Sequence, residues 1–174
     1  MNSESQEILE SLKTAIELEN KGLITFLKFA RATKNEAGKN MFIQLAMDEQ
    51  KHREILENQM EKIITGKPFG KITISFASIE KILPKVKDKV KKIKGEAGVD
   101  EVDALNAALD LESNAKKYFM EQSQKVTNPD AKKMFMDLAD WEETHYRIIQ
   151  AELDALQQTG FWYDMPEFRM DGKM

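Results

Sequence analysis

The sequence predicts an all-α protein, a four-helix bundle made of two repeated antiparallel helical hairpins. Glycine and proline are scarce, with 8 and 4 residues among 174, which favours long uninterrupted helices. Apolar residues recur at alternating spacings of three and four in four long segments, as expected for packed helices. The two halves of the chain also match each other at an offset of 93 residues. The length suits one domain that contains an internal duplication.

The first predicted hairpin joins a helix from about Ser3 to Lys34 with a helix from about Glu36 to Thr65. Asn35 lies at the turn between them. Gly66 and Pro68 follow the second helix and are expected to end it.

The second predicted hairpin has the same layout. Its first helix begins near Asp100, which we expect to be the N-cap. Its second helix opens at Asn128-Pro129-Asp130, with an N-cap, a proline at the first helical position and an acid in the first turn. The bundle is therefore expected to occupy residues 1–160.

Two segments lie outside the four helices. Residues 66–99 form a long crossover with a short extended stretch and a short helix, as expected when two antiparallel hairpins lie side by side. Residues 161–174 form an aromatic tail that we expect to pack over the bundle or a neighbouring subunit, with substrate gating as the alternative.

The chemistry-bearing residues of the two halves coincide. The 93-residue offset superimposes two Glu-x-x-His motifs, which contain the only two histidines of the chain, and it also aligns one glutamate of the first helix with one of the third. These six residues are Glu19, Glu49, His52, Glu112, Glu142 and His145. Each lies on the apolar face of its helix. Four carboxylates and two imidazoles are the ligand inventory of a di-metal site in a four-helix bundle.

Their distances from the turns place the four carboxylates at one level of the bundle. Glu19 and Glu49 lie 16 residues before and 14 after Asn35, and Glu112 and Glu142 have the same spacing around Asn128. At 1.5 Å per residue, all four are about 20 Å from the helix ends. Four buried carboxylates without counter-charge would repel each other or take up protons. Two divalent cations balance them, and this ligand set suits two iron ions, with manganese or zinc as further possible occupants.

A single Glu-x-x-His motif is weak evidence, because one buried histidine usually serves packing. The repeated motif together with the matched glutamates favours metal binding over this structural interpretation. We interpret the methionines differently, as core residues rather than ligands. They are Met41, Met47, Met120, Met134 and Met136.

These motifs resemble the rubrerythrin branch of the ferritin-like superfamily, over roughly residues 3–156. The resemblance implies a ferritin-like fold and a di-iron centre in which Glu49 and Glu142, or their counterparts Glu19 and Glu112, bridge the irons, while His52 and His145 each bind one. It also implies reduction of hydrogen peroxide or reaction with dioxygen, a role in oxidative-stress defence, and association as a homodimer or larger assembly. The long crossover would also allow hairpins to be exchanged between chains.

The chain departs from that family in several ways. It has no cysteine, so the rubredoxin-like domain is missing and the electron donor must be a separate rubredoxin-like protein or another molecule. Rubrerythrins carry a further glutamate where Ala115 stands here, opposite Gly22 of the first helix. Phe26 replaces a tyrosine, and Tyr118 or Tyr146 is left as a candidate hydrogen-bond partner near the metals. Small residues at 22 and 115 would leave room for peroxide.

Composition excludes other classes of function. The net charge of −4 argues against nucleic acid as the main partner. No apolar run is long enough to span a membrane, and the N-terminus lacks signal-peptide features, so we expect a cytoplasmic protein. Three alternatives to a peroxide or dioxygen reductase stay open: ferroxidase or iron handling, a non-catalytic bundle stabilised by metal, and an oxygenase with an organic substrate.

Overall fold

The computed structural model describes residues 3–70 and 99–159, and these ranges contain four helices and no strand. The helices are α1 (Ser3–Ala32), α2 (Glu36–Ile64), α3 (Val99–Lys125) and α4 (Pro129–Thr159). The predicted all-α fold is therefore confirmed. Most of the predicted crossover, residues 71–98, and the tail, residues 161–174, lie outside the described residues. No helix of the described ranges combines the length and apolarity that a bilayer span requires.

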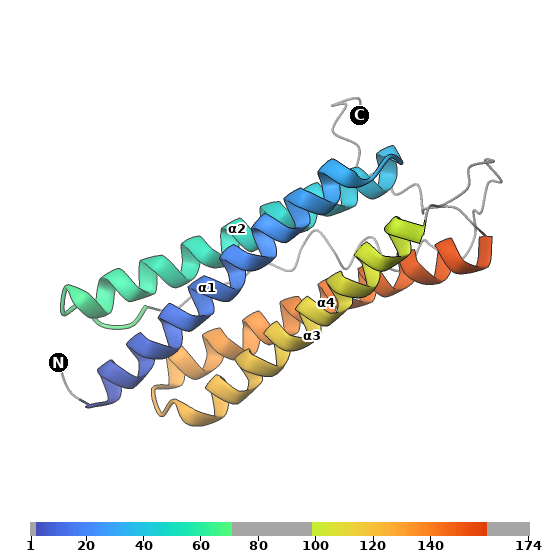
Figure 1. Cartoon of the computed structure of the whole chain (residues 1–174). Coiled ribbons are helices and arrows are strands. Elements are labelled where there is room, and N and C mark those ends of the chain that lie inside the picture. The colour runs from blue at the N-terminus through green and yellow to red at the C-terminus, as the bar shows by residue number, and fades with distance from the viewer. Residues whose placement is uncertain (1–2, 71–98, 160–174) are drawn as a thin grey trace, which may run out of the picture.

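The helices form two antiparallel hairpins that lie side by side (Figure 1). α1 packs along α2 and α3 packs along α4, while α1 also contacts α3 between the hairpins. α2 and α3 run in the same direction, so the end of α2 and the start of α3 lie at opposite ends of the bundle. This arrangement is the one that the duplicated sequence predicts.

Equivalent asparagines begin the second helix of each hairpin. The Asn35 side chain accepts hydrogen bonds from the backbone N–H groups of Ala37 and Gly38, at 2.9 and 3.2 Å. The Asn128 side chain accepts one from the backbone N–H of Ala131 at 3.0 Å. Each asparagine therefore supplies an acceptor to N–H groups that have no partner inside the helix. The two turns thus fix the same register in both hairpins.

Two helix ends differ from the predicted ones. α1 ends at Ala32, two residues before the predicted Lys34. Both the backbone N–H and the hydroxyl of Thr33 donate to the carbonyl of Phe29 at 2.8 Å, which closes the last turn of the helix. Asp100 is not an N-cap, because Val99 is already helical and Asp100 lies inside α3.

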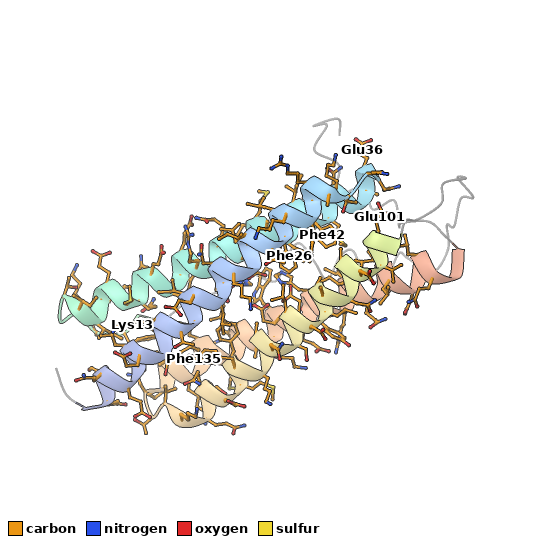
Figure 2. The ribbon with its side chains drawn as sticks, viewed as in Figure 1. Lys13, Phe26, Glu36, Phe42, Glu101 and Phe135 are labelled. Atoms are coloured by element: carbon orange, nitrogen blue, oxygen red, sulfur yellow. The ribbon has the colours of Figure 1, made fainter. Side chains whose placement is uncertain are left out.

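The core is divided into two apolar clusters, one on each side of the bundle's middle. Phe26 and Phe42 stack at 6.4 Å in one cluster, and the equivalent Phe119 and Phe135 stack at 6.3 Å in the other. Figure 2 shows Phe26 and Phe42 toward one end of the bundle and Phe135 toward the other. Each fully buried phenylalanine contributes about 1.5–3 kcal/mol to stability. The two clusters hold the helices on both sides of the level where the six predicted residues lie.

The prediction that five methionines fill the core is wrong for three of them. Met41 and Met134, which are equivalent in the repeat, are buried. Met47, Met120 and Met136 are 48%, 46% and 51% exposed. These three lie off the apolar seams of their helices, so the helical period turns them toward solvent.

Candidate metal centre

The structure brings all six predicted residues together in the middle of the bundle. α1 and α3 each supply one glutamate, and α2 and α4 each supply a glutamate and a histidine one turn later. None of the six is more than 3% exposed. The equal spacing from the two asparagine turns accounts for their common level.

Their side chains form two groups that overlap. One group is Glu19, Glu49, His52 and Glu142, and the other is Glu49, Glu112, Glu142 and His145. Within each group, one ligand-type atom per residue lies within 4.8 Å of the others. Each group therefore offers three carboxylates and one imidazole, and the carboxylates of Glu49 and Glu142 belong to both.

Both histidines turn the same ring nitrogen toward the carboxylates. The Nδ1 atom of His52 lies 3.4 Å from Glu19 and 3.3 Å from Glu142. The Nδ1 atom of His145 lies 3.3 Å from Glu49 and 3.5 Å from Glu112. The two imidazole rings are stacked with centroids 5.6 Å apart. The carboxylates of the two groups thus face Nδ1 in each case.

The polar atoms of this cluster lack ordinary partners. Among the described residues, both oxygens of Glu19 and of Glu142 and all four ring nitrogens of the histidines have no hydrogen bond, although they are fully buried. Buried polar groups without partners cost about 1–3 kcal/mol each, and charged ones more. Divalent cations accept electron pairs from these oxygen and nitrogen atoms, and two cations balance four carboxylates. The donor set therefore fits a pair of metal ions.

Protonation is the other way in which the protein reduces the negative charge of this cluster. Burial raises the pKa of Glu19 well above its usual value, and the nearby Glu49 and Glu142 carboxylates raise it further. Burial and the Glu142 carboxylate likewise raise the pKa of Glu112. The protonated forms of Glu19 and Glu112 are therefore favoured in the metal-free cluster, and a bound cation would favour the ionised forms instead.

The pKa values of Glu142 and His145 are shifted in opposite directions by the groups around them. Burial alone would raise the pKa of Glu142, but the Glu112 carboxyl and the two histidine rings hold it well below its usual range. Burial would lower the pKa of His145, but Glu112 and Asp48 beside it raise it well above its usual value. In the metal-free cluster, these neighbours therefore favour the negative charge on Glu142 and the positive charge on His145.

Metal-free protein is expected to be more stable near pH 5 than near pH 8. Glu19, Glu112 and His145 have raised pKa values, so the stability they contribute is present below their unfolded pKa values and is lost as pH rises through the folded ones. The lowered pKa values of Glu142 and Asp48 have the opposite effect, but it is lost only below about pH 4. Thermal unfolding in the presence of a chelator measures this difference in stability. Each kcal/mol of unfolding free energy is expected to shift the unfolding temperature by about 2–4 °C. A Glu19→Gln, Glu112→Gln double variant should show a flatter profile, and stability that rises from pH 5 to 8 would contradict the assignment.

A cavity of about 70 Å³ adjoins the carboxylates on the side of α1 and α3. Its walls include Gly22, Phe26 and Ala115, and all four site glutamates border it. Lys21 and Asn114 line the cavity and are exposed, so it reaches the surface between α1 and α3. The predicted room beside Gly22 and Ala115 is therefore present.

Gly22 also has a second role, because a larger residue would press on Glu49. A Cβ atom at this position would lie 3.2 Å from the carboxylate carbon and from one carboxylate oxygen of Glu49. Ordinary carbon–oxygen contacts are longer, so the carboxylate would have to move. The absence of a side chain at residue 22 thus lets a shared carboxylate keep its position.

Gly22→Ala is expected to weaken metal binding without destabilising the metal-free helix. Alanine favours the helix interior over glycine by about 1 kcal/mol, so metal-free stability should stay the same or rise. Metal affinity should fall about tenfold or more as Glu49 is displaced. Metal titration and thermal unfolding of the same variant separate the two effects. Unchanged affinity would show that Glu49 tolerates the displacement.

Two neighbours of the site were not among the predicted residues. Asp48, 4% exposed, lies 3.6 Å from His145, and Trp141, 6% exposed, meets the ring of His52 edge-on with centroids 5.2 Å apart. Their equivalence at the 93-residue offset is the only signal in the sequence that could have found them. Of the two candidate tyrosines, Tyr118 donates its hydroxyl hydrogen to the backbone carbonyl of Ser11 at 2.8 Å, which ties α3 to α1.

Comparison with known proteins agrees with this architecture. A family profile described as "Ferritin-like domain" matches residues 9–155. No curated protein matches the chain. Among solved structures, the chain is similar to a hypothetical protein from Pyrococcus furiosus, with 25% identity and a TM-score of 0.64, over 86% of this chain and 90% of that one. Since the profile spans the four helices and all six buried residues, the chain belongs to the ferritin-like domain family.

Proposed function

We propose that the six buried residues hold two iron ions and that the protein is a rubrerythrin-like reductase of hydrogen peroxide or dioxygen. The observation that carries this proposal is the pair of overlapping ligand groups, which share Glu49 and Glu142. Glu19 and His52 would complete one iron site, and Glu112 and His145 the other. Manganese or zinc would fit the same donors.

Two ferrous ions held by these residues would supply Lewis acidity and the two electrons that, with two protons, convert hydrogen peroxide to two water molecules. The protein would position the metal ions and shield the reacting molecule from water. Leu18, Phe26 and Leu111 form apolar walls of the cavity beside the carboxylates. These walls limit the water around the reacting molecule, while the surface opening near Lys21 and Asn114 gives protons from solvent a path inward.

The size of the cavity favours a small oxidant over an organic substrate. About 70 Å³ holds a few molecules the size of water. Pockets for larger organic ligands measure about 300–1,000 Å³. Peroxide and dioxygen are close to water in size, so the cavity supports reduction of an oxidant more than oxygenation of a bound organic substrate.

Reducing equivalents would come from outside the chain. The sequence has no cysteine, and cysteine is the ligand that rubredoxin-like and iron–sulfur centres require. We therefore propose a separate electron donor, which returns the irons to the ferrous state after each turnover.

Stopped-flow oxidation of the ferrous protein tests this function. Peroxide should oxidise the two irons at least about tenfold faster than dioxygen does, with two electrons consumed per peroxide. Ala115→Leu, which fills the cavity, should slow the reaction while both metals stay bound. Ser113→Leu, exposed on the same helix, should not.

Other outcomes of this experiment identify the alternatives. Oxidation by air that continues far beyond two irons per chain would indicate ferroxidase and iron handling. Slow oxidation of the wild type by both peroxide and dioxygen, no faster than that of Ala115→Leu, would indicate a non-catalytic bundle with a structural metal site. Either outcome would overturn the reductase proposal.

A further inference from the structure

The internal duplication allows the surroundings of the two ligand groups to be compared position by position. Residues 48 and 141 are equivalent at the 93-residue offset. Each directly precedes the glutamate of its Glu-x-x-His motif and lies one helical turn before the histidine. Both are buried, yet one is aspartate and the other is tryptophan. The two halves therefore share the same candidate ligands but differ in the residue that precedes each Glu-x-x-His motif.

Asp48 faces the histidine of the opposite hairpin. Its Oδ2 atom lies 3.6 Å from Nε2 of His145, a few tenths of an ångström beyond ordinary hydrogen-bond length. Its Oδ1 atom accepts hydrogen bonds from Lys51 at 2.8 Å and from Gln44 at 3.2 Å. These two donors on α2 hold the carboxylate in place and leave its second oxygen directed at His145.

The ring nitrogens of His145 consequently have separate surroundings. Nδ1 faces the carboxylates of Glu49, Glu112 and Glu142, at 3.3, 3.5 and 3.7 Å. Nε2 faces Asp48 instead. With a proton on Nε2 directed at Asp48, Nδ1 is left to donate its electron pair toward the centre.

His52 has no equivalent support. Trp141, at the position that matches Asp48, places its ring edge-on to His52 with an interplanar angle of 76°. An indole offers no acceptor for an imidazole N–H. Within the described residues, the carboxylates that lie within 4.0 Å of His52 are those of Glu19, Glu49 and Glu142, and all three approach Nδ1. Nε2 of His52 therefore has no carboxylate beside it among these residues.

We propose that Asp48 is a positioning residue for His145, and that the Glu112–His145 group therefore binds its metal more tightly than the Glu19–His52 group. A carboxylate that accepts the outer N–H of a histidine fixes its tautomer and orientation and increases the basicity of the nitrogen that binds the metal. The inference rests on the proposed metal centre and adds an order of filling to it.

Anaerobic titration of metal-free protein with Co(II), followed by visible absorption, tests the proposal. The wild type should fill in two steps whose dissociation constants differ at least about tenfold. Glu19→Gln should remove the weaker step and Glu112→Gln the tighter one. Asp48→Asn, which keeps the shape of the side chain, should weaken the tighter step about 10- to 100-fold and leave the other nearly unchanged.

A charge control and a second readout separate positioning from general disruption. Asp140→Asn removes the same charge from an exposed position beside Trp141 and should alter neither step. In proton NMR spectra of the Co(II)-loaded protein, the outer N–H of His145 should give a shifted signal that exchanges slowly with solvent in the wild type and is lost in Asp48→Asn.

The outcomes distinguish this inference from the proposed function. Two equal binding steps in the wild type would overturn the inference and leave the metal centre standing. Equal effects of Asp48→Asn and Asp140→Asn, or equal weakening of both steps by Asp48→Asn, would also overturn it. No binding in the wild type would overturn the metal centre itself. The wild-type titration needs no variant, so a folding defect in Asp48→Asn leaves the inference testable.

Discussion

Replacing Glu142 by glutamine is expected to remove tight metal binding at both sites, whereas replacing Glu19 should remove it at only one. The carboxylate of Glu142 belongs to both ligand groups, and that of Glu19 to one. An amide is a much poorer ligand than a carboxylate, so we expect each lost ligand to reduce affinity by more than about 100-fold. Metal content after titration should therefore fall from two per chain to none in Glu142→Gln and to one in Glu19→Gln.

A neighbouring glutamate provides the matched control for this comparison. Glu143 is adjacent in sequence but pairs with Lys116 at 2.7 Å and with Arg147 at 2.8 Å, outside the cluster. Glu143→Gln should bind two metals like the wild type. Thermal unfolding of the metal-free variants establishes that each has folded. Retention of two tight metals by Glu142→Gln would show that the carboxylate is not shared.

Metal loading is expected to raise the unfolding temperature by about 8–16 °C for each site. A ligand at a thousandfold excess over its Kd stabilises the folded state by about 4 kcal/mol, and a chain of this size gains about 2–4 °C per kcal/mol. The physical source is the cluster itself, whose buried oxygens and nitrogens lack hydrogen bonds among the described residues. Bound cations supply the missing partners.

Differential scanning calorimetry with and without Mn(II) measures this gain without redox chemistry. A Glu49→Gln, Glu142→Gln double variant lacks both shared carboxylates, so its unfolding temperature should be nearly independent of the metal. A large metal-dependent gain in the double variant would place the stabilising site elsewhere.

The repeat made the helices and the site predictable. The spacing of three and four fixes which face of each helix is buried, and the offset of 93 residues fixes the correspondence between hairpins. Asn35 and Asn128 then set the level of the four glutamates, and all six predicted residues meet there. Local sequence patterns were sufficient to predict the site, because its residues lie at equal distances from the turns along straight helices.

The surroundings of the centre depend on packing that the sequence does not encode locally. Asp48 lies beside the seam of α2, and only the approach of α4 brings it to His145. Gly22 was predicted to leave room for an oxidant, whereas its closeness to Glu49 depends on how tightly α1 and α2 pack. The burial of Met47 was mispredicted because composition favours methionine in cores while its helical position faces solvent.

Anaerobic Fe(II) titration of the metal-free protein tests the central claim most directly. The two overlapping ligand groups predict saturation near two irons per chain, with tight binding that the Glu49→Gln, Glu142→Gln double variant loses. Binding that is absent, or that continues without saturation far beyond two irons per chain, would contradict a paired metal centre formed by these six residues.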